Sequence, residues 1–166
     1  MKSNGRAILN GGSIPVISPD LLAEIISTSS DLALHIDRDG RIISVLANPH
    51  QRSFGELSGW KGRPIASVLT DDSIAKFKRR LEQLRDASES TSQLIEITHK
   101  DGENQEFPIR YALHRLPSDD SVLMLGRDLR AIAEIQQKLV SVQMALEKDY
   151  EAQREIDTRY RVLMEM

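Results

Sequence analysis

Apolar residues recur at alternating steps of three and four through the C-terminal part of the chain, where no glycine or proline follows Gly126. This spacing predicts one long helix over residues 128–166, with a seam of side chains that faces a partner helix. At 1.5 Å per residue the helix would extend about 55 to 60 Å, farther than the preceding domain could cover. We therefore expect the seam to join this chain to a second copy, by default as a parallel homodimer and otherwise as a higher homo-oligomer. The seam consists of Ile132, Ile135, Leu139, Val142, Leu146, Asp149, Gln153, Ile156, Tyr160 and Leu163.

Two members of this seam, Asp149 and Gln153, are polar and follow one another at its middle. Two interpretations are open. Polar residues at single core positions often do no more than set the register and the number of chains in a coiled coil. Alternatively, the polar pair weakens the pairing, so that the two helices shift or separate and a partner protein exchanges a dimer contact for its own.

Residues 19–127 carry the mixed pattern of an α+β domain. Ser18-Pro19-Asp20 supplies an N-cap, a proline at the first helical position and an acidic first turn, which predicts a short helix. A second helix is predicted from Asp71 to Ala87, where apolar residues have helical spacing. Five further segments are predicted as antiparallel strands, from partial alternation of their side chains and from the turn residues that bound them: 32–36, 41–46, 92–99, 105–116 and 121–127. We expect a five-stranded antiparallel sheet with helices on one face.

A few residues constrain this sheet and its connections. Gly40 and Gly102 are expected in tight turns with positive φ. Pro108 has no N–H to donate, so we expect it at a sheet edge or at a bulge. Residues 48–64 have the composition of loops and short helical turns, in which Trp60 anchors a loop over the sheet or, as the alternative, forms part of a ligand lid.

Composition and charge narrow the possible functions. With 22 basic and 25 acidic residues the net charge is −3, and no helix-turn-helix pattern is present, so we do not expect this part to contact DNA. The absence of cysteine excludes disulfides, thiolate metal sites and thiol redox sensing. Residues 1–18 are expected to be a disordered N-terminus without a signal-peptide core. Since no apolar run is long enough to span a bilayer, we expect a cytoplasmic protein without membrane contact.

Residues able to perform catalysis or to bind a metal do not group in the sequence. The acidic pair Asp71-Asp72 lies where a helix N-terminus favours acids, and Asp119-Asp120 lies in a turn, so neither is an acid–base pair. The histidines sit on predicted strands or in a loop, without metal-ligand spacing among them: His35, His50, His99 and His114. We therefore expect no catalytic, metal-binding or cofactor-binding residue and no cofactor, and we interpret the chain as a non-enzyme.

Several strings of the sequence resemble known families. The strings DRDGRIISVLAN, GWKGRPIASVLTDDS, THKDGENQEFPIRY and LGRDLRAIAEIQQKL resemble a PAS domain over about residues 20–130. They include the exit Asp128-Leu129-Arg130, which resembles the segment that joins PAS domains to signalling helices. More specific strings are ANPHQRSFGELSGWKGRP, FPIRYALHRLP, LMLGRDLR and DYEAQREIDTRYRVL. These resemble the N-terminal domain and glutamine-rich linker helix of the PpsR/CrtJ repressors of photosynthesis genes, over nearly the whole chain.

This resemblance implies a transcription regulator with tandem PAS domains. In such a regulator DNA is bound only through a C-terminal helix-turn-helix that this chain lacks, and residues 159–166 resemble the helix that leads into a following PAS domain. The resemblance also implies an anti-repressing partner, either a flavoprotein or a bacteriophytochrome, and the composition does not choose between them.

Two functions remain open for the PAS-like domain. It is either a dimerisation and protein-interaction module whose state the long helix transmits, or a small-molecule sensor of another signalling protein whose cavity binds a ligand. The single tryptophan, three tyrosines and three phenylalanines offer few stacking partners for a flat cofactor. This composition favours the interaction module.

Overall fold

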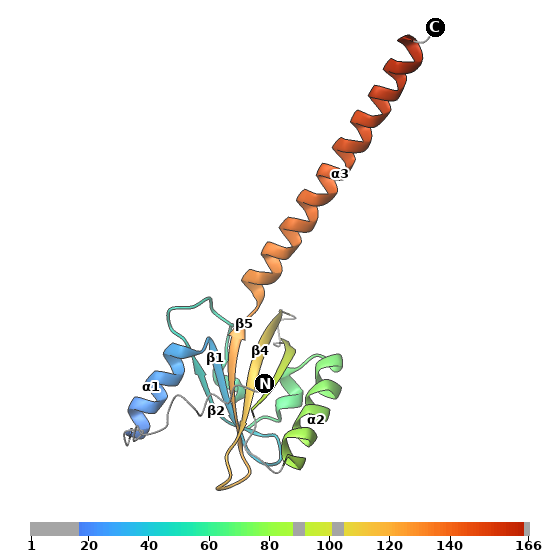
Figure 1. The fold of residues 1–166 in the computed structure, drawn as a ribbon. Coiled ribbons are helices and arrows are strands. Elements are labelled where there is room, and N and C mark those ends of the chain that lie inside the picture. Colours follow the sequence, from blue (N-terminus) through green and yellow to red (C-terminus); the bar gives the residue numbers. More distant parts are fainter. Residues whose placement is uncertain (1–16, 88–91, 101–104, 165–166) are drawn as a thin grey trace, which may run out of the picture.

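The computed structural model describes residues 17–87, 92–100 and 105–164. Helices and strands follow one another in the predicted order (Figure 1). The helices are α1 (Pro19–Ser29), α2 (Asp71–Asp86) and α3 (Arg130–Met164), and two short 3-10 turns, η2 (Ser58–Trp60) and η3 (Ile65–Val68), precede α2. The strands are β1 (Leu32–Ile36), β2 (Ile42–Ala47), β3 (Gln93–Lys100), β4 (Glu106–Arg115) and β5 (Val122–Asp128).

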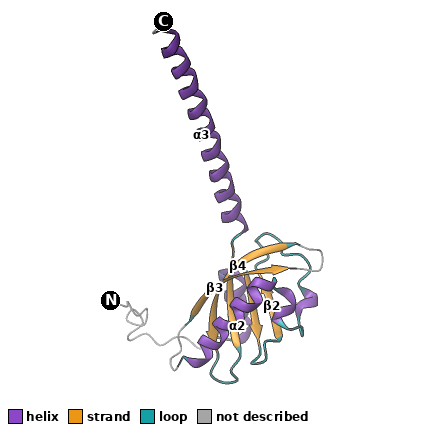
Figure 2. Ribbon diagram, turned by 90° about the vertical axis from the view of Figure 1, so that its right-hand side faces the viewer, coloured by secondary structure: helices purple, strands orange, loops and turns teal. Residues whose placement is uncertain are grey.

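The strands form one five-stranded sheet in the order β2-β1-β5-β4-β3, and every neighbouring pair is antiparallel (Figure 2). This confirms the predicted α+β class. The β1–β2 pairing shifts register between His35 and Ile36, which marks a bulge near the hairpin turn. Within that turn Gly40 has a φ of 84°, and its N–H donates to the Asp37 carbonyl over 3.1 Å, so the predicted turn role is confirmed.

The core lies between the sheet and the segment that contains η2, η3 and α2. Because side chains alternate across a strand, Leu32, Leu34 and Ile36 all face this side, where none is more than 1% exposed. Phe77 and Leu84 of α2 pack against them from the other layer. The core is therefore complete within residues of the domain itself.

Helix α1 departs from the expectation that the helices share one face. Figure 1 shows α1 beside β1 and β2, on the opposite side of the sheet from α2. The alternation along β1 explains its place, since Ala33 points away from the core and is still only 1% exposed. None of the α1 residues is itself buried.

Pro108 also differs from its predicted position. It lies in the inner strand β4, opposite Thr98 of β3, and not in an edge strand. The last pair between β4 and β5 is Ile109 with Asp128, so Pro108 is one residue beyond the end of that ladder. Its carbonyl accepts from the Leu129 N–H at 3.0 Å, and a proline is tolerated because no strand faces its missing N–H.

Two expectations fall largely outside the described residues. The disordered N-terminus predicted for residues 1–18 overlaps them only at Ile17 and Ser18. There the Ser18 hydroxyl caps α1 by accepting from the Leu21 N–H at 3.3 Å. The turn that contains Gly102 lies outside the described residues.

Candidate functional site at the exposed helix and its junction

Helix α3 leaves the domain and extends away from it (Figures 1 and 2). It is 35 residues long, and none of these residues is buried. All predicted seam residues lie on this one helix, and the apolar ones range from 50% exposed at Ile132 to 71% at Leu163. Asp149 and Gln153 are exposed as well. No element among the described residues of the domain covers the seam. No helix in the described ranges has both the length and the apolarity that a membrane span requires.

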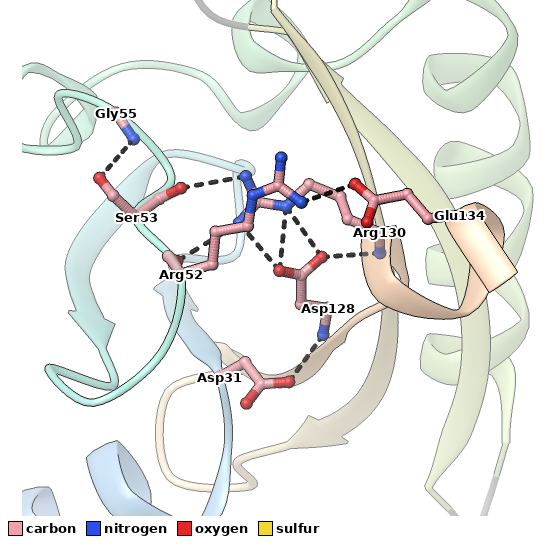
Figure 3. A network of polar contacts seen from close by, with 7 residues as sticks. All are labelled: Asp31, Arg52, Ser53, Gly55, Asp128, Arg130 and Glu134. Atoms are coloured by element: carbon pink, nitrogen blue, oxygen red, sulfur yellow. Dashed lines mark hydrogen bonds and ion pairs between the residues drawn. The ribbon is translucent and has the colours of Figure 1, made fainter.

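The base of α3 is held by the side chain of Arg130 (Figure 3). Its Nε donates to both carboxylate oxygens of Asp128, at 3.1 and 2.9 Å, and its Nη2 lies 2.8 Å from Oδ2 of the same group. Nη1 donates to the Ser53 carbonyl at 3.0 Å, and Nη2 to the Arg52 carbonyl at 3.3 Å. The Arg130 and Asp128 side chains are only 16% and 13% exposed, which makes this the most buried of the ion pairs in the described residues.

The guanidinium of Arg130 also covers two aromatic rings. Its Cζ lies 4.7 Å from the ring centre of Phe54 and 5.6 Å from that of Phe107, within the range of a cation–π contact. Phe54 belongs to the loop after β2, and Phe107 to β4. The first turn of α3 is therefore in contact with the hydrophobic core.

A second ion pair joins the same loop to α3. Arg52 Nη1 lies 2.8 Å from Glu134 Oε1, and the two side chains are 59% and 61% exposed. The hydrogen bond to Arg52 and the charge of that residue lower the pKa of Glu134, and the same contact raises the pKa of Arg52. Exposed pairs of this kind contribute little to stability.

Trp60 anchors the η2 turn in the core, as one of the two alternatives predicted. It is 2% exposed, and its ring stacks on Phe107 at an angle of 5° with the centroids 6.2 Å apart. His99 packs against both, with its centroid 4.9 Å from Trp60 and 5.4 Å from Phe107. We call Phe54, Trp60, His99, Phe107 and Tyr111 the aromatic cluster; it fills the space between the sheet and the η2 loop.

His99 is the one fully buried histidine of the described chain. Its Nδ1 lies 2.9 Å from the Val68 carbonyl and must donate to it, so Nε2 accepts from the Tyr111 hydroxyl at 2.7 Å. Burial lowers the pKa of His99 to about 4, although the bond to Val68 opposes the shift. Burial also raises the pKa of Tyr111 well above its ordinary value. Both residues are therefore neutral and serve the packing of the core.

The structure brings together a serine, a histidine and an acid that the sequence analysis did not connect. His35 Nε2 lies 2.8 Å from the Ser121 hydroxyl, and that hydroxyl donates to Asp119 over 2.6 Å. In a hydrolase triad the histidine lies between the serine and the acid, where it takes the serine proton. Here Ser121 lies in the middle, donates its hydroxyl hydrogen bond to Asp119 and is 1% exposed, so the group stabilises the β4–β5 turn and offers no accessible nucleophile.

The remaining candidate sites of the sequence stay apart. Asp71 and Asp72 lie in the first turn of α2, and Asp120 forms an ion pair with Arg115 at 2.6 Å. In the described part of the chain, histidine and acidic side chains form no group of three that could hold a metal ion. A polar surface hollow of about 460 Å³ lies beside α2 and β3, bounded by Ser73, Lys76 and Glu96 among others. It follows the middle of the edge strand β3, where α2 and β3 hydrogen-bond to each other.

Comparison with known proteins relates the whole chain to one curated protein. No family model matches the chain. The chain is 39% identical to Protein CrtJ of Rhodobacter capsulatus over 166 residues, which is 99% of this chain and 34% of CrtJ. The chain thus spans about a third of the length of this relative. The resemblance to the PpsR/CrtJ family that its sequence motifs indicate is confirmed.

Two solved structures that are similar to this one are PAS domains. The PAS domain of an HTR-like protein from Haloarcula marismortui has a TM-score of 0.51 at 20% identity, and covers 66% of this chain and 89% of its own. A PAS domain from a two-component sensor histidine kinase has a TM-score of 0.50 at 6% identity, over 66% of this chain and 94% of its own. At such identities the likeness concerns the fold alone, and it confirms the predicted PAS fold.

Proposed function

The chain is a PAS-fold relative of the PpsR/CrtJ repressors, and from this premise we propose that it forms the dimerisation and protein-interaction portion of such a regulator. In this proposal the cytoplasmic PAS domain of residues 19–127 sets the position of a linker helix at residues 128–166, and the helix pairs with that of a second copy. DNA is bound by a part of the regulator that this chain does not include. An anti-repressing flavoprotein or bacteriophytochrome competes for the helix.

The exposed seam of α3 is the observation that supports pairing. Leu139, Leu146 and Ile156 are 63 to 64% exposed and lie on one helix whose residues are all unburied. A helix of this length that keeps an apolar stripe in water gains stability by burying that stripe, at about 25 cal/mol per Å². A second copy supplies the matching stripe, because a heptad seam is complementary to itself in a parallel dimer.

The packing of the domain supports an interaction module over a small-molecule sensor. The rings of the aromatic cluster pack on one another between the sheet and the η2 loop, where a ligand of the sensor alternative would lie. Trp60, Phe107 and Tyr111 are each no more than 2% exposed, and their neighbours are side chains of the same domain. The Tyr111 hydroxyl donates its hydrogen bond to His99, so it is not available as a donor to a ligand.

A regulatory role without catalysis agrees with the side chains that are present. The serine, histidine and acid that meet at the β4–β5 turn have the wrong order for nucleophilic attack, and His99 is neutral and enclosed. The regulatory chemistry that we propose is the exchange of one helix partner for another. The polar residues Asp149 and Gln153 are the point where this exchange would begin, because they interrupt the apolar stripe between Leu146 and Ile156.

Cysteine cross-linking would test the parallel pairing, since the chain has no native cysteine. In an in-register parallel dimer the two copies of Val142 lie opposite each other in the seam, so we expect Val142→Cys to form an intermolecular disulfide on mild oxidation. Ser141→Cys lies next to it on the helix but outside the seam, and serves as the matched control. Sedimentation equilibrium on the unmodified chain gives the mass. A monomeric mass at all concentrations, or equal cross-linking at both positions, would contradict the proposal.

The partner would be tested by capture of the chain on an immobilised anti-repressor flavoprotein and, separately, on a bacteriophytochrome. We expect one of the two to retain the chain, and to retain less of it when Val142→Cys chains have first been cross-linked. Equal retention of free and cross-linked chains would mean that the partner binds without separating the two helices, which contradicts the proposed exchange.

A further inference from the structure

The connection between the sheet and α3 is a single residue. β5 ends at Asp128 and α3 begins at Arg130, so only Leu129 lies between them. The Leu129 N–H donates to the Pro108 carbonyl, which ties the backbone to β4 at one point. One backbone hydrogen bond leaves the helix free to pivot about that point unless side chains restrain it. The direction of the helix is therefore determined by the side chains of its first turn.

We propose that Arg130 is the positioning residue that sets the direction in which α3 leaves the domain. The N–H groups of its planar guanidinium donate to three acceptors, which are the Asp128 carboxylate and the carbonyls of Arg52 and Ser53. These acceptors belong to different segments, the end of β5 and the loop after β2. A rigid fork that binds acceptors on two segments fixes an angle between them, which a point charge does not do.

The faces of the same group add a second restraint. Phe54 and Phe107 lie beneath the guanidinium at 4.7 and 5.6 Å, and they pack on each other with their ring centres 5.2 Å apart. Both rings are buried, at 4% and 2% exposure. Arg130 cannot swing away from Asp128 without uncovering these rings, so the edge contacts and the face contacts restrain different rotations.

The partner of Arg130 is itself held in place. The Asp128 N–H donates to the Asp31 carboxylate at 2.8 Å, and Asp128 Oδ1 accepts from the Arg130 N–H at 2.9 Å (Figure 3). Asp31 lies immediately before β1. Restraints from the starts or ends of several strands thus converge on the first residue of the helix. Among the described residues the other side-chain link between α3 and the domain is the exposed pair of Arg52 and Glu134, which solvent screens.

A small change at this base produces a large displacement at the tip. A 35-residue helix extends about 50 Å, so a tilt of about 10° at Arg130 would move its end by about 9 Å. The functional consequence rests on the proposed dimer, in which the exit direction of each helix determines how the two domains face each other. The positioning role itself belongs to one chain and is measured within one chain.

Electron-spin distance measurements would test this role, because the chain contains no cysteine that could compete for labels. Labels on Lys78→Cys in α2 and Glu151→Cys in α3 report the angle between domain and helix, since both residues are exposed. Dilution of the labelled chain with excess unlabelled chain confines the distances to one molecule. We expect one narrow distance distribution for the parent chain.

Substitutions at the base should then separate positioning from general stability. We expect Arg130→Ala to broaden the distribution roughly twofold or more, and Arg130→Lys to broaden it as well, because lysine keeps the charge but not the fork. Two controls remove exposed ion pairs: Glu134→Ala breaks the pair with Arg52, and Arg110→Ala breaks the pair with Glu96 on the sheet surface. Both controls should retain the parent width.

An unchanged width for Arg130→Ala, or equal broadening by Glu134→Ala, would overturn the assignment. If Arg130→Ala unfolds the domain, Phe54→Leu decides instead. Leucine keeps most of the apolar volume and removes the ring face, so broadening is expected and an unchanged width counts against the role of Arg130. Sedimentation equilibrium on the same samples reports dimerisation separately. A monomeric chain with Arg130-dependent width would refute the proposed dimer and leave the positioning role intact.

Discussion

The domain and the long helix are stabilised in different ways, although one residue separates them. In the domain, Leu32, Leu34 and Ile109 are fully buried against other parts of the same chain. In α3, the apolar residues of the seam are at least 50% exposed, and no residue of the helix is buried. The stability of the domain should therefore be independent of protein concentration, whereas burial of the seam depends on concentration by mass action. One set of conditions or mutations should affect the domain and a different set the helix.

The largest expected effect is the loss of pairing when acids replace seam leucines. Leu139→Asp with Leu146→Asp places four carboxylates in the proposed dimer seam and removes four apolar side chains worth about 1.5 to 3 kcal/mol each. We expect the dimer dissociation constant to rise by at least about a thousandfold, or about 4 kcal/mol, by sedimentation equilibrium. The melting temperature of the domain should stay the same.

Matched substitutions on the same helix provide the control for this variant. Gln137→Asp with Ser141→Asp adds the same charges outside the seam, and should leave the dissociation constant within about threefold of the parent value. Equal loss of pairing in both double variants would mean that added charge, and not the seam, is responsible.

The converse experiment damages the domain and leaves the helix. A Cβ at Gly126 in β5 would lie 2.6 Å from Ile109 Cγ2, 2.7 Å from Tyr111 Cε1 and 2.8 Å from the Leu32 carbonyl oxygen. We expect Gly126→Ala to lower the free energy of unfolding of the domain by about 2 to 3 kcal/mol in denaturant titrations. Gly59→Ala is the control, because a Cβ there meets no atom within 4 Å. Pairing through α3 should persist in both, and similar losses in the two variants would contradict the packing described for Gly126.

Acid should likewise weaken the domain alone. The pKa of His99 is about 4 in the folded chain and 6.5 ordinarily, so the unfolded chain binds the proton more readily. The stabilisation is complete above pH 6.5 and is lost as the pH falls toward 4. This group should cost about 2 kcal/mol between pH 8 and pH 5. No histidine occurs in residues 128–166, so pairing should change little over that range.

Two measurements would check this pH dependence. The His99 ring protons should keep the NMR shifts of a neutral imidazole down to pH 5. His99→Gln can donate to Val68 and accept from Tyr111, and its unfolding free energy should vary less with pH than that of the parent chain. A His99 titration near pH 6.5 would show that the ring is hydrated in solution.

The smallest expected effect concerns the polar middle of the seam. Asp149→Leu with Gln153→Leu should tighten the dimer about tenfold and reduce capture by the anti-repressing partner, because the exchange of helices would lose its starting point. Glu151→Leu with Thr158→Leu changes an acid and a neutral polar residue on the opposite face of α3 and serves as the control. If the first double variant dimerises no more tightly, or partner capture is undiminished, the polar pair only sets register or lies in solvent.

Local patterns in the sequence predict most of this fold. Partial alternation and the bounding turn residues predict the five strands, and the turn before β2 follows from Gly40, whose positive φ is a local property of the backbone. The position of α1 behind the sheet was not predicted, since its apolar stripe fits either face and only the burial of Ala33 distinguishes them. Pro108 was misplaced because its environment depends on where β5 ends, which is a matter of register between strands distant in sequence.

In the candidate site, too, some features follow from local sequence patterns and others do not. Periodicity predicts that all seam residues lie on one helix, and the pairing of α3 with a second helix remains a prediction. No local pattern in the sequence identifies Arg130 beyond its place in the exit segment. Its contacts come from residues more than 70 positions earlier, such as Arg52 and Ser53. A signal was present, in that a basic residue follows an acid by two positions at the start of a helix, but this pattern is common and does not identify the rings beneath the guanidinium.

The single residue between β5 and α3 also determines how α3 is rotated about its own axis relative to the sheet. Each residue inserted or deleted at Leu129 would turn the helix about its own axis by about 100°, since an α-helix has 3.6 residues per turn. The seam residues of α3 would then face a different direction relative to the domain, although the residues themselves would be unchanged. An insertion of seven residues would restore the original facing to within about 20°. For chimaeras that fuse this domain to a foreign output helix, the helical phase counted from Asp128 decides which way the output faces.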